Sequence, residues 1–312
     1  MSSVTDSRIL SFSEKEQLCE INFMEGGPFW HIYTDGTKMQ NIFRTETDFD
    51  GGMAVLGVAS CLVPDVRLLT FELMSNHVHL IASGAREECL KLSDIFKDRL
   101  RRIMSVRGIS VDWKNFTASI LPIEDLRALR NEIVYVNRNA FVASPQYTPY
   151  NYPWGGGCAY FNPMTHRLQV TRLEDMSYDR KRELSHSRDV SGLNRLAFDG
   201  KRIHIPSFCD IRLGESVFAD ARSYFNSLTR NAETFSQIAE RLKDAVFLTD
   251  DELFQVAVKE AVRNFETRQL TLLEPAQKIQ LAKDLHFRFN ASNQQLRRLL
   301  RLDMALLNEL FA

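Results

Sequence analysis

Alternating apolar and polar residues mark two blocks in the first half of the chain, over residues 66–73 and 77–83. Successive side chains on a strand point to opposite faces of a sheet, so this period of two predicts one long strand or a bent pair of strands. Residues 28–43 are rich in aromatic and β-branched side chains and include an Asp-Gly turn signal. They predict a further strand followed by a turn.

A second period, with apolar side chains three and four residues apart, predicts helices between these strands and beyond them. In the first half of the chain, this spacing occurs over residues 45–61, 87–106 and 124–139. In the C-terminal part, helices are expected over residues 235–246, 250–265, 275–289, 293–300 and 304–311. The pattern predicts an α+β protein whose C-terminal region is mostly α-helical.

Prolines interrupt the regular pattern between residues 145 and 153, and the stretch after them is less regular. Such breaks mark loops and candidate domain boundaries. We predict a mixed α and β domain over residues 1–160, a connecting region of mixed or irregular structure over 161–230, and a helical region over 231–312.

The composition is that of an ordinary globular protein, with 312 residues, 44% hydrophobic and 25% charged. No stretch approaches the roughly 18 consecutive apolar residues that span a bilayer, and the first residues lack the pattern of a signal peptide. We therefore expect a cytoplasmic protein with no membrane partner. The five cysteines lack Cys-x-x-Cys spacing, which argues against a zinc ribbon or a disulfide framework. The net charge of −1 excludes a global basic field but not a local basic face.

Two histidines, His77 and His79, flank Val78 in the second alternating block. Alternate side chains share one face of a strand, so both imidazoles can reach one metal ion while Val78 points into the core. Two imidazoles leave coordination positions open, as a catalytic metal requires. The pair predicts a divalent-metal site on a β-strand.

The residues around this pair resemble a known family. The run Met-Ser-Asn-His-Val-His-Leu over residues 74–80 is similar to the signature of single-tyrosine HUH transposases, especially their REP-associated branch. Ser75 stands where that family usually has proline. The likeness covers roughly residues 28–160 and includes the segments Phe29–Ile32, Asn41–Arg44, Ile133–Asn137 and Tyr152–Trp154.

The resemblance implies a ferredoxin-like HUH domain, an antiparallel sheet with helices on one face. It also implies cleavage and rejoining of single-stranded or hairpin DNA, in which a tyrosine hydroxyl attacks the scissile phosphate and a 5′-phosphotyrosine link forms. Mg²⁺ or Mn²⁺, held by His77 and His79, would polarise that phosphate. Members of the family often pair, so a homodimer is a further expectation.

The nucleophile is where the sequence departs from the family. The family places tyrosine four residues, or one helical turn, before an asparagine that a proline follows. Here Asn137 is present and is implied as a third metal ligand, but Ile133 and Arg138 replace the tyrosine and the proline. Tyr135, the candidate catalytic residue, precedes Asn137 by two residues, which is about 200° around a helix.

Three alternatives stay open for this nucleophile. Tyr135 acts from a locally distorted helix, or another tyrosine reaches in from the proline-rich loop. In the third alternative the nucleophile is lost, and the protein is a non-catalytic, DNA-binding descendant of such a transposase. The other candidate tyrosines are Tyr147, Tyr150, Tyr152 and Tyr160. A metallohydrolase built on the two histidines is a weaker hypothesis, because no carboxylate-rich ligand set is visible nearby in the sequence.

Two groups of basic residues are candidate DNA contacts. Lys97, Arg99 and Arg102 lie near one face of the helix expected over 87–106, where they could contact phosphates or form a solvated surface. Residues 275–311 have the spacing of a helix-turn-helix, with Arg297, Arg298 and Arg301 as its candidate phosphate contacts. Its last helix offers almost only Asn308 to base edges, so a plain three-helix bundle or a packing surface for a partner are alternatives.

Overall fold

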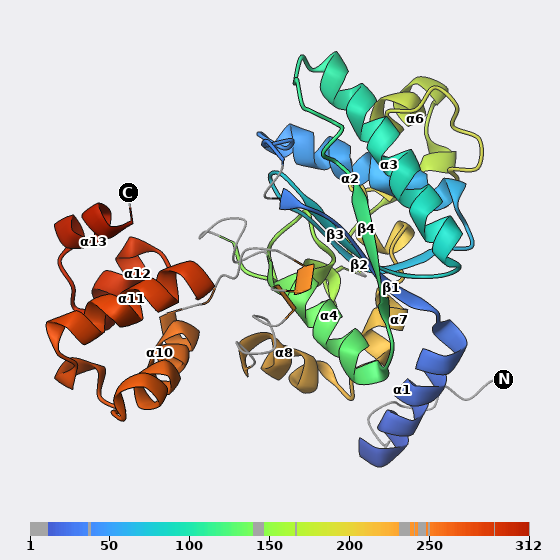
Figure 1. The fold of residues 1–312 in the computed structure, drawn as a ribbon. Coiled ribbons are helices and arrows are strands. Elements are labelled where there is room, and N and C mark those ends of the chain that lie inside the picture. The colour runs from blue at the N-terminus through green and yellow to red at the C-terminus, as the bar shows by residue number, and fades with distance from the viewer. Residues whose placement is uncertain are drawn as a thin grey trace. The chain divides into compact units, whose positions relative to one another are not determined.

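The computed structural model divides into two compact units, Met1–Leu228 and Thr229–Ala312 (Figure 1). It describes residues 12–36, 39–139, 147–165, 167–230, 238–239, 241–242, 248, 250–289 and 291–311. The first unit contains a four-stranded antiparallel sheet with helices, and the elements described in the second unit are helical. The predicted α+β class is therefore confirmed.

Four strands form the sheet: β1 (Phe29–Thr34), β2 (Arg67–Leu73), β3 (Val78–Ser83) and β4 (Ala118–Ile123). Two helices, α2 (Glu46–Leu62) and α3 (Arg86–Val106), separate them, so that the chain order is β1-α2-β2-β3-α3-β4. The order of the strands across the sheet is β2-β3-β1-β4. Every neighbouring pair is antiparallel.

The two alternating blocks of the sequence form a hairpin rather than one long strand. Strands β2 and β3 pair directly, and the turn between them is closed by the amide of Met74, which donates to the carbonyl of His77 at 2.9 Å. His79 lies in β3, as predicted, but His77 lies in the turn just before it. The histidine pair therefore spans the entry to a strand.

Cross-strand register assigns side chains to the two faces of the sheet, because directly opposed residues point to the same side. One face, here called the apolar face, carries the row Phe71, Leu80, Ile32 and Ile120. The other, here called the histidine face, carries the rows Glu72, His79, Tyr33, Ser119 and Thr70, Ile81, His31, Leu121.

Helices cover both faces. Helices α2 and α3 pack against each other beside the apolar face, where a Cβ atom on Gly52 of α2 would lie 3.2 Å from Cδ1 of Leu73 (Figure 1). Helix α4 (Leu126–Arg138) lies against the histidine face, where Glu132 contacts His31. The prediction of helices on one face describes α2 and α3 only, since α4 takes the opposite side.

Residues 161–228 belong to the first unit, although the sequence pattern set 161–230 apart as a connecting region. Cys209 forms a bridge with Leu68 at the edge strand β2, and the amide of Asp210 donates to the carbonyl of Leu68 at 2.6 Å. Covering an edge strand satisfies backbone groups that would otherwise be open to another chain. The remaining elements of this unit are α1 (Phe12–Gly26), η2 (Gly156–Ala159), β5 (Thr171–Arg172), η3 (Leu173–Asp175), α6 (Tyr178–Ser185), β6 (Ala197–Phe198), η4 (Ile205–Ser207), α7 (Ile211–Ser216) and the larger part of α8 (Ala221–Arg230).

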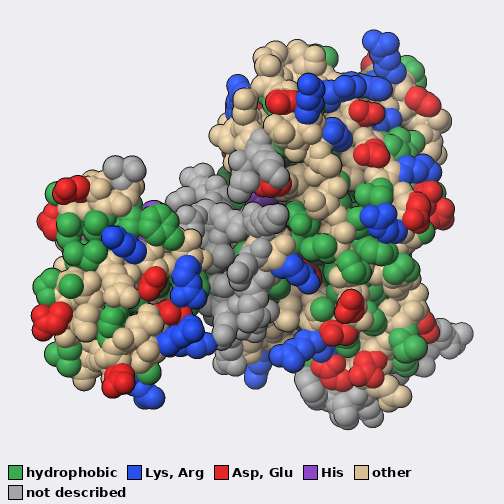
Figure 2. Space-filling model, in the orientation of Figure 1, with side chains coloured by type: hydrophobic (Ala, Val, Ile, Leu, Met, Phe, Trp, Pro, Cys, Tyr) green, Lys and Arg blue, Asp and Glu red, His purple; other side chains and the backbone are tan. Residues whose placement is uncertain are grey.

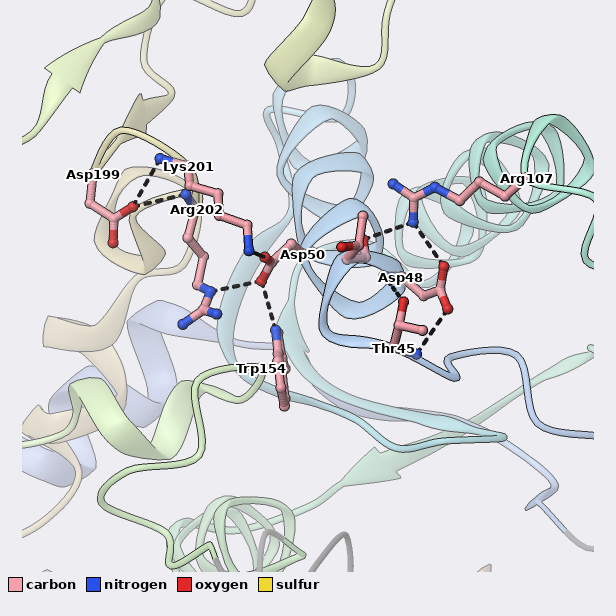
Figure 3. Close-up of polar contacts among 9 residues, drawn as sticks. Thr45, Asp48, Asp50, Arg107, Trp154, Asp199, Lys201 and Arg202 are labelled. Carbon is pink, nitrogen blue, oxygen red and sulfur yellow. Dashed lines mark hydrogen bonds and ion pairs between the residues drawn. The ribbon is translucent and has the colours of Figure 1, made fainter.

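Two buried aspartates of helix α2 form hydrogen bonds and ion pairs with segments that are distant in the sequence (Figure 3). Asp50 accepts from Nε1 of Trp154 at 2.8 Å and from Nε of Arg202 at 2.7 Å. Asp48 lies in the first turn, where it forms a capping box with Thr45, and pairs with Arg107 at 3.0 Å. These contacts connect the start of α2 with the end of α3 and with the segment after α4.

The second unit contains helices α10 (Asp250–Phe265), α11 (Pro275–Phe289), α12 (Asn293–Leu300) and α13 (Met304–Leu310), with a short η5 (Leu270–Leu272). These helices share one apolar core that includes Leu281, Leu296 and Leu307. The helix expected over 235–246 lies largely outside the described residues. No helix in the described part of the chain is long and apolar enough to cross a membrane.

Candidate functional site

Three buried histidines meet on the histidine face of the sheet. His31 lies in β1, His79 lies in the neighbouring β3, and His77 ends the turn that leads into β3. Their exposed fractions are 0% for His31 and His79 and 8% for His77. Buried polar groups are almost always hydrogen-bonded, so the contacts of these rings define what the site can do.

Glu132 of α4, His31 and His79 form a continuous buried chain of hydrogen bonds. Oε2 of Glu132 lies 2.7 Å from Nδ1 of His31, and Nε2 of His31 lies 3.0 Å from Nδ1 of His79. With Glu132 ionised and both rings neutral, His31 donates through Nδ1 and accepts at Nε2 from Nδ1–H of His79. In that arrangement the lone pair of His79 is on Nε2.

His77 is oriented in the same way by the turn around it. Its ring centre lies 5.0 Å from that of His79. Its Nδ1 lies 2.7 Å from Oδ1 of Asn76, which can only accept, so the lone pair of a neutral His77 is also on Nε2. Asn76 in turn donates to the carbonyl of Gly36 at 2.8 Å, which joins the turn after β1 to the turn before β3.

A divalent metal held by these two rings would have to bind through their Nε2 atoms, because each Nδ1 already has a hydrogen-bond partner. Hydrogen bonds that fix the second nitrogen of a histidine are the usual support of a metal ligand. Among the residues that the structure describes, no group of three or more His, Cys, Asp or Glu side chains is placed to hold a metal ion. Any metal held by His77 and His79 would therefore need water or substrate oxygens to complete its coordination.

Tyr135 lies at this site. Its ring centre is 5.8 Å from that of His79 and 6.2 Å from that of His31. Glu132 and Tyr135 are three residues apart on α4 and so share the side of the helix that meets the sheet. The ring is 4% exposed. The two-residue offset from Asn137 therefore does not keep Tyr135 away from the histidines.

Asn137, the implied third ligand, is engaged elsewhere. Its Oδ1 accepts a short hydrogen bond from the hydroxyl of Thr70, and its Nδ2 donates to the hydroxyl of Tyr224 in α8 at 2.8 Å. The side chain is fully buried. It links α4 to β2 and α8, and both polar atoms of its amide already have hydrogen-bond partners.

The tyrosines of the proline-rich loop and its continuation have structural partners. The hydroxyl of Tyr160 donates to the carbonyl of Leu69 at 2.9 Å, and that of Tyr152 donates to the carbonyl of Leu73 at 2.5 Å. Burial raises the pKa of both hydroxyls above the usual range. The ring of Tyr147 packs on Tyr152, and Tyr150 packs on Phe225. These contacts support the loop rather than the histidine site.

A buried carboxyl group, Glu72, lies on β2 directly opposite His79 in the sheet register. It is 1% exposed, and its Oε1 atom has no hydrogen-bond partner among the described residues. Burial raises the pKa of this carboxyl well above its usual range. A Cβ atom on Gly155 would lie 1.9 Å from Oε2 of Glu72, so only glycine allows the backbone to cover the carboxyl group. The carboxyl group is therefore buried beside the site, where its neutral form is favoured over its charged form.

Three residues of this site have no signal of their own in the sequence: His31, Glu132 and Tyr33. Tyr33 is half-buried, and its ring lies nearly parallel to that of His79 at 6.2 Å. His31 and Tyr33 lie within the stretch that resembles the transposase family, but the sequence pattern does not distinguish them from other strand residues. Only the register of β1 against β3 reveals that they share a face with His79.

The basic residues predicted on α3 separate into two sets. Arg99 and Arg102 line a surface cavity together with residues of the segment 186–189, whereas Lys97 does not. Arg99 donates to the hydroxyl of Ser187 at 3.3 Å. The cavity is described further below.

The basic residues predicted on α12 have different surroundings. The guanidinium of Arg298 forms two hydrogen bonds with Asp250, at 2.7 and 3.0 Å, which neutralise its charge locally. Arg301 follows the helix in a left-handed conformation with φ 55°, and Arg297 is exposed. Asn308 of α13 accepts from Asn293 at 2.9 Å, so the one polar group suited to reading bases is already engaged.

Comparisons with protein-family models, with curated proteins and with solved structures find no match to this chain.

Proposed function

We propose that this protein is a transposase-like DNA strand-transfer enzyme that uses Tyr135 as its nucleophile beside a metal held by His77 and His79. The observation that supports this proposal most directly is the position of Tyr135. The centre of its ring lies 5.8 Å from that of His79 on the histidine face. The order of elements, β1-α2-β2-β3-α3-β4 with sheet order β2-β3-β1-β4, supports a ferredoxin-like arrangement. Helix α4 then carries the nucleophile across the face opposite α2 and α3.

In the proposed reaction, the hydroxyl oxygen of Tyr135 attacks the phosphorus of single-stranded or hairpin DNA. The bond between that phosphorus and the 3′ oxygen of the preceding nucleotide breaks as the 5′-phosphotyrosine bond forms. The tyrosine loses one proton and the released 3′ oxygen gains one, so the step is balanced and reversible without ATP. Mg²⁺ or Mn²⁺, when bound by His77 and His79, would polarise the phosphate.

The chain's own residues orient this site. The hydrogen bonds of 3.0 and 2.7 Å to His31 and from His31 to Glu132 orient the ring of His79 and leave Nε2 as the nitrogen that would bind a metal. Asn76 does the same for His77. His31 and Glu132 are positioning residues, because they act through His79 and do not touch the proposed ligand.

The low exposure of Tyr135, 4%, favours a second candidate function. A nucleophile must meet a phosphate, and a buried ring requires movement of α4 to do so. If α4 does not move to expose Tyr135, the protein is a DNA-binding descendant of such a transposase that does not cleave DNA. DNA binding without covalent chemistry is the outcome that distinguishes this alternative.

The test is a covalent-adduct assay on a denaturing gel with Mn²⁺ and a DNA hairpin that carries a single-stranded tail. We expect an adduct with the unmodified protein and with Tyr150→Phe, a control whose ring packs on Phe225 away from the histidines. Tyr135→Phe should abolish the adduct. An adduct that disappears only in Tyr33→Phe would move the nucleophile to β1, and hairpin binding without any adduct would support the second candidate.

A further inference from the structure

A basic groove runs between the C-terminal half of α3 and the segment that follows α6. Its cavity volume is about 1050 Å³, and its charged lining consists of Arg99, Arg101, Arg102, Arg107, His186, Arg188 and Asp189. Lys and Arg side chains gather in this region at the top of the view in Figure 2. The net charge of the whole chain is only −1, so this local excess of cations is not a by-product of a basic composition.

Several of these arginines have partners that fix them in place. Arg107 donates to the carbonyl of Thr47 at 2.7 Å and pairs with Asp48 at 3.0 Å (Figure 3). Arg101 pairs with Asp98 at 3.7 Å. In contrast, Arg102 and Arg188 are exposed and form no ion pair among the described residues. Both of these cations are therefore available to an external anion.

Burial and neighbouring cations lower the pKa of two basic groups in the groove. Burial and then the charge of Arg102 lower the pKa of Arg99. Burial and then the charge of Arg107 lower the pKa of His186. Like charges in the groove repel one another, and a bound anion would reduce that repulsion.

We propose that this groove binds the phosphate backbone of a nucleic acid strand. Arg99 and Arg107 are eight positions apart, which corresponds to about 12 Å along a helix. Phosphates of one strand in a duplex are spaced by about 3.4 Å along the axis, so three or four of them match this length. Guanidinium groups bind phosphate oxygens through paired hydrogen bonds, which suits them to this ligand better than lysine would be.

The groove is separate from the proposed cleavage site. Helix α3 packs beside the apolar face of the sheet, whereas His77, His79 and Tyr135 lie on the histidine face. Val106, 89% exposed, adds an apolar wall against which a sugar ring can pack. The groove is thus a second contact for nucleic acid and does not depend on strand-transfer chemistry.

The test measures binding of a fluorescent DNA hairpin to the full chain over a range of NaCl concentrations. Each phosphate contact contributes about 0.9 to the slope of log affinity against log salt. Arg102→Ala with Arg188→Ala should lower that slope by about 1.8 and weaken binding at 0.1 M salt by on the order of tenfold or more. Arg167→Ala, an exposed arginine outside the groove, should leave both values unchanged.

A second variant, Arg102→Lys with Arg188→Lys, distinguishes a loss of charge from a disturbance of the fold. It should keep the salt slope within about 0.5 of the unmodified protein, because both charges remain. Alanine variants that are folded and keep the original slope would overturn the proposal. Binding of a sulfated polysaccharide but not of the hairpin would overturn it too, in favour of another polyanion.

The same measurement keeps this proposal distinct from the proposed function. With Mg²⁺ and Mn²⁺ withheld, so that no metal contacts a phosphate, Tyr135→Phe and His77→Ala should retain the full salt slope of hairpin binding. If those two variants lose covalent chemistry and keep the slope, nucleic acid binding by the groove is supported independently of the proposed nucleophile. If the unmodified protein forms the adduct but the groove variants bind as before, only the groove is refuted.

Discussion

The two faces of the four-stranded sheet both have buried centres, on β1, β2 and β3, but these centres are chemically opposite. On the apolar face, Phe71, Leu80 and Ile32 pack in a row without a polar atom among their side chains. On the histidine face, His31 and His79 are just as inaccessible, yet they exchange hydrogen bonds with each other and with α4.

This difference shows that equal burial does not mean equal roles. Buried apolar side chains stabilise the fold in proportion to the area removed from water. Buried and hydrogen-bonded polar groups recover little more than the cost of their desolvation. The apolar face therefore supplies stability, and the histidine face supplies the orientation of particular atoms.

The largest expected effect is on the apolar face. Phe71→Ala should lower the free energy of unfolding of the first unit by about 3–5 kcal/mol, because it leaves a cavity beside Phe208. All three tryptophans of the chain lie in the first unit, so urea denaturation followed by tryptophan fluorescence reports on that unit alone. The exposed control Leu168→Ala should change stability by less than about 0.5 kcal/mol. A small loss in Phe71→Ala would contradict the assignment of stability to this face.

The second effect concerns the chain of Glu132, His31 and His79. Glu132→Leu should cost about 1–3 kcal/mol, because it leaves a buried donor on His31 unsatisfied. It should also weaken Mn²⁺ binding by about 10–100-fold, the usual effect of losing the support of a histidine ligand. Isothermal titration of Mn²⁺ and urea denaturation measure the two quantities separately.

The double variant His31→Phe with Glu132→Leu sharpens this test. The stability lost in the double variant should fall short of the sum of the single losses by about 0.5–3 kcal/mol, because both partners of one hydrogen bond are removed together. Its Mn²⁺ affinity should stay as low as that of the single variants. Additive losses, with unchanged Mn²⁺ affinity throughout, would show that the two residues only pack.

Local periodicity was enough to place most elements. The helix predicted over 124–139 is α4, Leu126–Arg138, and the one predicted over 293–300 matches α12 at both ends. Both sequences carry a strong apolar stripe and a side-chain cap, Asp125 and Ser292 respectively. Such signals lie within a few residues of each other, so no tertiary information is needed to detect them.

The site was only half visible in the sequence, for a physical reason. The spacing of His77 and His79 is local, and it identified the metal candidates directly. His31 joins them through a contact with a residue 48 positions away, and Asn137 meets Tyr224 across 87 positions. Register between strands and packing of α4 decide those contacts, and neither leaves a mark on the spacing of residues along the chain.

The third prediction tests whether Asn137 is a metal ligand. Asn137→Leu should cost about 1–2 kcal/mol of stability, because the hydroxyls of Thr70 and Tyr224 lose their partner. Mn²⁺ affinity should remain within about twofold of the unmodified protein, unlike that of Glu132→Leu. A loss of Mn²⁺ affinity as large as that in His77→Ala would restore Asn137 as a ligand.

The smallest effect depends on pH and on Glu72. Burial raises the pKa of this carboxyl in the folded protein, whereas the unfolded chain has the ordinary value of about 4.3. Between those two values the folded protein holds a proton that the unfolded chain has lost, so stability falls as the pH rises through this window. The slope reaches at most about 1.4 kcal/mol per pH unit, and Glu72→Gln should remove it.

Urea denaturation from pH 4 to pH 8 measures this contribution as the difference between the unmodified protein and Glu72→Gln. Near pH 4 the two proteins should differ little from this cause, and with rising pH the variant should gain stability relative to the unmodified protein. Glu124→Gln, at an exposed position, is the matched control and should run parallel to the unmodified protein. Parallel curves for Glu72→Gln as well would mean that the carboxyl group of Glu72 is solvated. The histidine face would then lack the dry environment that distinguishes a buried polar site from a wet surface.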